Sequence, residues 1–328
     1  MTTTTARAGE PPPAKRPITD APSRVDKAFR RVTTGGGITV LVLLVVIGFF
    51  LTLQAAPALH YAGFGFFSTV EFNTTADSPV FGVLGMLTGT ITVALVAVLV
   101  AVPISILAAL FITNYAGARL RGLLTGLVDL LAAIPSLLYG LWGFSFLAPQ
   151  VEPVAAWLSR NFSWIPLFAT QQNATLTQSM FVAGLVVSLM VLPITTSIIR
   201  EVFAQSPPGE KEAALALGGT RWGMVRSVVL PFGRGGIVGG AMLGLGRALG
   251  ETIAVSLLLP QLPAIVTHVL ESGGATISGF IAHNAGISGL GLNAMMAAGL
   301  VLFLFTLATN FSASIIISRS RSGAGVDA

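Results

Sequence analysis

The stretch EAALALGGTRWGMVRSVVLP, residues 212–231, carries charges of both signs and lies between two long apolar segments. Just ahead of it, Ser206 and Pro207 predict a helix start, because a hydroxyl caps a helix and proline suits the first helical position. From Glu210, helix-forming residues continue without a break to Leu217. We therefore expect a short helix that enters the quoted stretch from its N-terminal side.

A glycine elbow should end this helix, because Gly218 and Gly219 follow directly. Thr220 can cap a second helix, and we expect Pro231 to limit it. The first helix has small apolar residues on one face and charged residues at one end. It could lie on the inner leaflet or dock into a protein groove. Alanines in place of large anchors, and acidic residues that anionic lipid repels, favour the protein groove.

The composition is that of an integral membrane protein. Of 328 residues only 9% are charged, and the mean hydropathy is +0.83. So few polar side chains could not cover a soluble core of this apolarity. The chain has no cysteine, which excludes disulfides and thiolate metal sites. Apolar runs long enough to cross a bilayer predict an all-α, polytopic protein with six transmembrane helices. The expected spans are 38–56, 81–112, 122–148, 178–199, 234–259 and 292–318.

The positions of lysine and arginine predict the orientation of these spans. Seven of the 18 basic residues precede the first span, and most of the others fall in alternate loops. Both termini and the loop 200–233 should therefore face the cytoplasm. Residues 1–36 lack apolar periodicity and are expected to be a disordered cytoplasmic tail, with a second tail at 319–328. This distribution explains the positive net charge, so no nucleic-acid partner is needed.

Apart from Arg234 at the edge of the fifth predicted span, the charged residues inside the predicted spans are Asp129, Arg247 and Glu251. Arg247 and Glu251 are four residues apart, so on one helix they would share a face and could pair. One interpretation is a buried ion pair that fixes helix packing. The other is an arginine on an anion path whose charge Glu251 moderates. We interpret Asp129 as a helix-end or interhelical contact.

The chain lacks the motifs of an enzyme acting alone. It has no GxxxxGK[ST] loop for ATP, no HExxH and no paired carboxylates at catalytic spacing. We expect no catalytic residue, no bound metal and no cofactor in this chain.

The quoted stretch also resembles the EAA loop of ABC importer permeases. The pattern is E-A-A, three residues, Gly, nine residues, an aliphatic residue, any residue, Leu and Pro. It is matched by Glu212, Ala213, Ala214, Gly218, Val228, Leu230 and Pro231. Three further stretches are similar to the phosphate importers of this superfamily: LAAIPSLLYGLWG at 131–143, LPITTSIIREV at 192–202 and LGLGRALGETIAV at 243–255.

This resemblance implies a type I, MetI-like permease in the bacterial inner membrane. The chain would form half of a pore for inorganic phosphate with a PstA-like permease. A PstB-like ATPase dimer would use the ATP, and a PstS-like binding protein would deliver phosphate. The EAA residues Glu212, Ala213, Ala214, Gly218, Leu230 and Pro231 would couple the chain to the ATPase. Arg247 and Glu251 would line the substrate path. The alternatives are a permease for another oxyanion, such as molybdate or sulfate, and an ATP-independent secondary transporter.

Overall fold

The computed structural model describes residues 24–74, 78–171 and 174–320. By its internal contacts the chain divides into two units, residues 1–49 and 50–328. The first unit holds the start of helix α1 (Arg24–Ala62). Because α1 begins at Arg24, residues 24–36 are helical, where the sequence predicted a disordered tail. Arginine, lysine and alanine at its start are good helix formers and run directly into the apolar span. Residues 1–23 lie outside the described residues.

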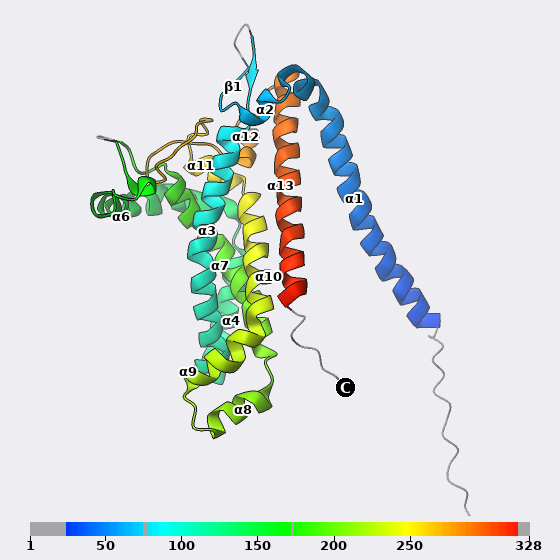
Figure 1. Ribbon diagram of the computed structural model, residues 1–328, viewed down its shortest axis with the longest axis vertical. Coiled ribbons are helices and arrows are strands. Elements are labelled where there is room, and N and C mark those ends of the chain that lie inside the picture. Colours follow the sequence, from blue (N-terminus) through cyan, green and yellow to red (C-terminus); the bar gives the residue numbers. More distant parts are fainter. Residues whose placement is uncertain (1–23, 75–77, 172–173, 321–328) are drawn as a thin grey trace, which may run out of the picture. The chain divides into compact units, whose positions relative to one another are not determined.

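Three long helices form the centre of the second unit. They are α3 (Leu84–Leu110), α7 (Met180–Ala204) and α10 (Leu230–Leu249), which lie side by side in Figure 1. The helix α13 (Leu290–Ser320) packs against α10. The most apolar stretch of α7 is 67% buried, more than in any other candidate span of the described chain. The predicted spans 81–112, 178–199 and 292–318 fall largely within α3, α7 and α13.

Glycines on α10 let it approach α7 closely. A Cβ atom on Gly236 would lie 2.5 Å from Val202, and one on Gly244 would lie 2.6 Å from Val191. Between them, the Thr195 hydroxyl of α7 donates a hydrogen bond to the Gly240 carbonyl of α10 (3.4 Å). The small residues along the fifth predicted span therefore allow tight helix packing.

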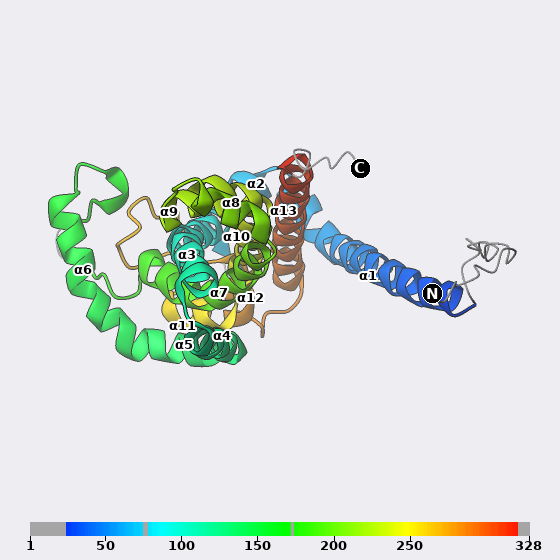
Figure 2. The same cartoon turned by 90° about the horizontal axis from the view of Figure 1, so that it is seen from below.

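The third predicted span, 122–148, is broken. The helix α4 (Ala118–Ala133) ends before Pro135, and the chain turns by 89° into α5 (Ser136–Trp142), η2 (Gly143–Leu147) and α6 (Ala148–Asn161). Ile134 is extended (ψ 128°), because a residue that precedes proline is disfavoured in the helical conformation. Figure 2 shows α5 and α6 running around the side of the helices. The described residues contain five helices able to cross a membrane, or six if this bent pair is one span.

The fifth predicted span, 234–259, is displaced toward the N-terminus. One rod runs from Arg221 to Leu249 through α9 (Arg221–Met224), the π-helical turn η4 (Val225–Val229) and α10. Pro231 therefore does not end the second helix, contrary to expectation. The wide turn just before it accommodates the ring and the missing N–H donor. The rod ends at Leu249, and α11 (Ile253–Leu258) follows after a break.

Several short elements gather at one end of the second unit, opposite α8 (Pro208–Ala216). Two strands, β1 (Phe72–Asn73) and β2 (Val80–Phe81), pair antiparallel with Phe72 opposite Phe81. Beside them lie α2 (Gly65–Ser68) and α12 (Ile277–His283), where the Phe72 ring meets Phe280 edge to face. The other short elements of the described chain are η1 (Phe111–Tyr115), which extends α3, and η3 (Pro166–Phe168).

Candidate functional site

The glycine elbow predicted from the sequence is present at the end of α8. Gly218 has φ +84°, in the left-handed region that glycine adopts readily. Its N–H donates to the Leu215 carbonyl (3.0 Å), and the Gly219 N–H donates to the Ala214 carbonyl (3.1 Å). These two bonds form a Schellman motif, which satisfies carbonyls left free at a helix end. The chain thus turns sharply between α8 and the rod Arg221–Leu249.

The two glycines of the elbow are needed for different reasons. A Cβ atom on Gly218 would meet nothing within 4 Å, whereas one on Gly219 would lie 2.5 Å from the Ala214 carbonyl oxygen. After the elbow, Thr220 caps α9 as predicted, its hydroxyl accepting from the Gly223 N–H (3.1 Å). Ser206 does not cap α8. Its hydroxyl donates to the Phe203 carbonyl (2.6 Å) at the end of α7, and Pro207 occupies the cap position instead.

The EAA residues do not all face the same way. Ala214 packs against an apolar cluster that joins α3, α7 and the start of the rod, and Leu230 packs against the same cluster. Glu212, Ala213, Gly218 and Pro231 are exposed. Next to the elbow, Leu217 is 90% exposed. The elbow is therefore anchored on its inner side, while its outer side presents a carboxylate and an apolar side chain.

One basic residue of α8 lies near the Arg121 guanidinium of α4. Burial, followed by the nearby Arg121 guanidinium, lowers the pKa of Lys211 on α8. Arg121 is itself fixed at the end of α3, where it donates to the carbonyls of Ile112 (3.1 Å) and Thr113 (3.0 Å). Arg121 thus joins the start of α4 to the turn η1 that follows α3, and Lys211 of α8 lies near enough to feel its charge.

The second group of predicted site residues lies at the far end of the same rod. Arg247 is in the last turn of α10, but Glu251 lies in the break between α10 and α11. The two therefore do not share a helix face, and no ion pair within 4.0 Å joins them among the described residues. Glu251 is buried (8% exposed) and accepts instead from the Ala254 N–H (3.4 Å) at the start of α11. The predicted pairing of Arg247 with Glu251 on one helix face is wrong, because α10 ends at Leu249, before it reaches Glu251.

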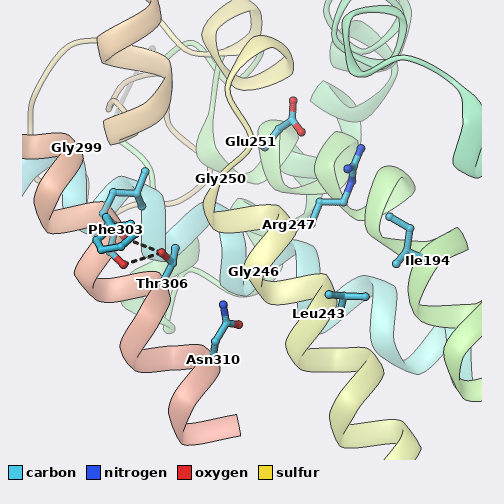
Figure 3. Close-up of a pocket in the computed structure, with 11 residues that line it drawn as sticks. Ile194, Leu243, Gly246, Arg247, Gly250, Glu251, Gly299, Phe303, Thr306 and Asn310 are labelled. Carbon is cyan, nitrogen blue, oxygen red and sulfur yellow. Dashed lines mark hydrogen bonds between the residues drawn. The ribbon is translucent and has the colours of Figure 1, made fainter. Parts of the chain in front are cut away.

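Arg247 is exposed and lines a cavity of about 740 Å³ between α10, α13 and α7. Figure 3 shows Glu251 above the end of α10 and Arg247 projecting from its last turn on the side away from α13, whereas Thr306 and Asn310 project from α13 toward α10. The Thr306 hydroxyl donates to carbonyls of its own helix, at Leu302 (2.9 Å) and Phe303 (2.9 Å). Within the part of the chain that the structure describes, neither the Asn310 amide nor the Arg247 guanidinium makes a hydrogen bond.

Asn310 is the site residue that the sequence reasoning missed. It stands inside the predicted span 292–318, and an amide in so apolar a segment is itself a signal of function. Asp129 behaves as expected, since it accepts from the Ser197 hydroxyl (3.5 Å) and joins α4 to α7. Chemically, the cavity offers a guanidinium whose planar fork can bind an oxyanion through two parallel hydrogen bonds.

Comparison with known proteins agrees with this architecture. Residues 101–322 match the family model "Binding-protein-dependent transport system inner membrane component". The chain is 41% identical over 305 residues to phosphate transport system permease protein PstC 2 of Mycobacterium tuberculosis, covering 92% of this chain and 94% of that protein. It is 40% identical over 309 residues to PstC of Mycobacterium leprae, covering 93% and 95%.

Among solved structures, the chain is similar to one in a bacterial ABC transporter involved in the import of alginate. The TM-score is 0.54 at 21% identity, over 89% of this chain and 99% of that one. This likeness confirms the predicted permease fold. The predictions of a helical, multi-pass inner-membrane protein and of a permease component rather than an enzyme are confirmed as well. The chain belongs to the family of binding-protein-dependent transport system inner membrane components, within its PstC group of phosphate transport permeases.

Proposed function

We propose that this chain forms one half of the translocation path of an ATP-driven importer of inorganic phosphate. The observation that carries the proposal is Arg247, an exposed guanidinium that lines a cavity beside apolar helices. A charge at membrane depth is costly, at least about 2.5 kcal/mol on insertion scales, and such residues usually serve transport. The names of the relatives in Mycobacterium support phosphate as the substrate.

Phosphate would meet Arg247 without first displacing a bound carboxylate. Because the Ala254 N–H holds Glu251, the guanidinium is left for the passing anion. The nearby Glu251 charge weakens anion binding without neutralising Arg247, which suits a path that must also release its substrate. Asn310 adds a second polar side chain to the lining of this cavity: its Oδ1 lies 3.5 Å from the position of a Cβ on Gly246.

A PstA-like permease is the proposed partner that completes this path. The cavity is lined mainly by residues of α7, α10 and α13, and Arg247 and Leu243 among them are exposed in the single chain. Leu307 of α13 is also a large apolar side chain that is exposed. A second permease packed against this face would cover these residues and enclose the cavity.

Coupling to a PstB-like ATPase dimer would use α8 and the elbow. Glu212 and Leu217 form the outward surface that fits a groove on such a partner. The rod that begins at the elbow continues without a break to Leu249 and carries Arg247 in its last turn. At 1.5 Å per residue its 29 residues follow a helical path of about 43 Å, which changes direction between α9 and α10 in Figure 1. A rotation of α8 caused by ATPase closure would therefore move Arg247.

The proposed orientation follows the lysine and arginine positions. Both termini and α8 would face the cytoplasm, and the end with β1 and α12 would face outward. A PstS-like binding protein would deliver phosphate at that outer end. Alternating access between the two sides then draws its work from the ATPases, which bind ATP preferentially in one conformation.

The test is radiolabelled phosphate uptake by the purified complex reconstituted in vesicles. Uptake should need ATP, the ATPase and the binding protein, and excess sulfate or molybdate should not compete. Competition by either anion would reassign the substrate to that oxyanion. Uptake without ATP would replace the proposal with a secondary transporter.

A further inference from the structure

The first turns of α1, residues 24–34, form an amphipathic helix. At 100° per residue, Val25, Phe29 and Val32 fall within one narrow arc of the helix surface. Their side chains are 75%, 70% and 73% exposed. The opposite arc carries only basic and hydroxyl side chains: Arg24, Lys27, Arg30, Arg31 and Thr34. An apolar stripe facing a basic one is the pattern of helices that lie in a membrane surface.

The length of α1 places this segment outside the hydrocarbon of the bilayer. The helix has 39 residues, which at 1.5 Å each span about 58 Å. The apolar part from Ile38 to Ala62 already exceeds the roughly 30 Å of a hydrocarbon core. If α1 continued without a bend, the apolar stripe of residues 24–34 would project into water.

Three consecutive glycines separate the two parts of α1. Glycine is the poorest helix former after proline, and Gly35, Gly36 and Gly37 occupy the interior of the helix. A Cβ atom on any of them would meet nothing within 4 Å, unlike those on the α10 glycines that pack against α7. Within the first unit, packing therefore gives no reason for these three glycines.

Hydroxyl groups on either side of the glycines weaken the helix further. The Thr33 hydroxyl donates to the carbonyls of Phe29 (3.0 Å) and Arg30 (3.1 Å), and that of Thr39 donates to the Gly35 carbonyl (2.9 Å). Hydroxyls bonded back to the preceding turn often bend helices. Bending at the glycines is thus favoured by two independent features.

We propose that residues 35–37 are a hinge, and that residues 24–34 lie on the inner leaflet as a helix that binds anionic phospholipid. The apolar stripe would sit at the boundary of the acyl chains, and the basic face would contact lipid phosphates. The inference rests on the cytoplasmic N-terminus of the proposed function. Lipid is the occupant because the span that follows holds the segment at the membrane surface, where its charge complements anionic headgroups.

Spin labels can measure this placement directly, because the chain has no native cysteine. The full complex would carry a nitroxide at Phe29→Cys or, separately, at Lys27→Cys, in phosphatidylcholine vesicles with or without an equal share of phosphatidylglycerol. With phosphatidylglycerol, the label at 29 should be relaxed by oxygen and shielded from a water-soluble nickel chelate. The label at 27 should show the reverse. Without anionic lipid this difference should shrink.

Two variants test the contribution of the basic side chains and that of the glycine hinge separately. Arg30→Gln with Arg31→Gln should lower the ratio of docked to undocked helix by roughly 25-fold, at about fivefold per basic residue. Thr34→Gln, which keeps the charge, is the matched control and should not change it. Gly36→Ala stiffens the hinge and should also reduce docking.

Equal exposure of both labels to the chelate in anionic vesicles would overturn the proposal, because the helix would then project into water. Shielding of both labels from both reagents would also overturn it, since the helix would then be covered by protein. Phosphate uptake measured in the same vesicles reports separately on the proposed function.

Discussion

Replacing Gly218 tests how the elbow beside the EAA motif works. Its φ of +84° costs an L-residue about 1–2 kcal/mol, whereas the space around its Cβ position is empty within 4 Å. The cost of a substitution at 218 is therefore conformational and not steric in this chain. Asparagine tolerates the left-handed region, so Gly218→Asn should be mild. Gly218→Val should be severe, because branched side chains avoid this region.

Hydrogen exchange of the purified permease subunit, followed by mass spectrometry, measures this effect without the ATPase. A loss of about 1–2 kcal/mol lowers the population of the closed elbow about 5- to 30-fold. The Gly219 N–H donates to the Ala214 carbonyl in the closed elbow. In Gly218→Val this amide hydrogen should therefore exchange faster by the same factor. Gly219→Ala is the steric comparison, since its Cβ would lie 2.5 Å from the Ala214 oxygen.

The relative exchange rates at Gly219 in the two Gly218 variants test this explanation. If Gly218→Asn and Gly218→Val exchanged equally fast at Gly219, the left-handed backbone would not be the reason for glycine. If both exchanged as slowly as the native chain yet both lost the ATPase, the empty space around Gly218 would be where the partner docks.

Two other perturbations follow from the packing and charge of the helices. Gly244→Val should lower the melting temperature of the purified subunit, because its Cβ would lie 2.6 Å from Val191 and overpacking costs about 1–3 kcal/mol; Gly246→Ala, with only an ordinary contact, should not. A Gly244→Val subunit as stable as the native one would contradict the close packing. Lys211 has a lowered pKa in the folded state, so keeping its proton costs stability at neutral pH; this cost begins to fall at the lowered pKa and is gone above the ordinary pKa of lysine. Lys211→Met should therefore not destabilise α8 at neutral pH and should flatten the rise of stability toward alkaline pH, as seen by thermal melts over pH; a clear loss at neutral pH would show that the charge itself is needed.

Much of the fold could be predicted because its causes are local. Long apolar runs identify the helices, and Gly218, Gly219 and Thr220 encode the elbow through backbone conformation and capping. These effects depend on a few adjacent residues. The small residues of α10 likewise predicted close packing, although only the structure identifies α7 as the neighbour.

Two of the wrong helix boundaries lie next to prolines, whose effect on a helix depends on the backbone around them. Pro135 breaks the third span by 89°, while Pro231 is passed by a continuous rod, because a π-turn precedes it. Sequence spacing alone does not distinguish these outcomes. The predicted pairing of Arg247 with Glu251 assumed a helix that in fact ends at Leu249. The amphipathic stripe of residues 24–34 was overlooked because it is short and lies next to a much longer apolar run.

Phosphate uptake by Arg247 variants, normalised to assembled complex, tests the central claim most directly. The Ala254 N–H, not Arg247, holds Glu251, so Arg247→Gln should assemble with its partners. Its uptake should fall at least about tenfold, since one hydrogen bond to a charged group is worth about 1.5–3 kcal/mol. Arg247→Gln with Glu251→Gln should not restore uptake, and Arg247→Lys should restore only part of it. Full uptake by assembled Arg247→Gln, or by the double variant, would contradict the assignment of Arg247 to the phosphate path.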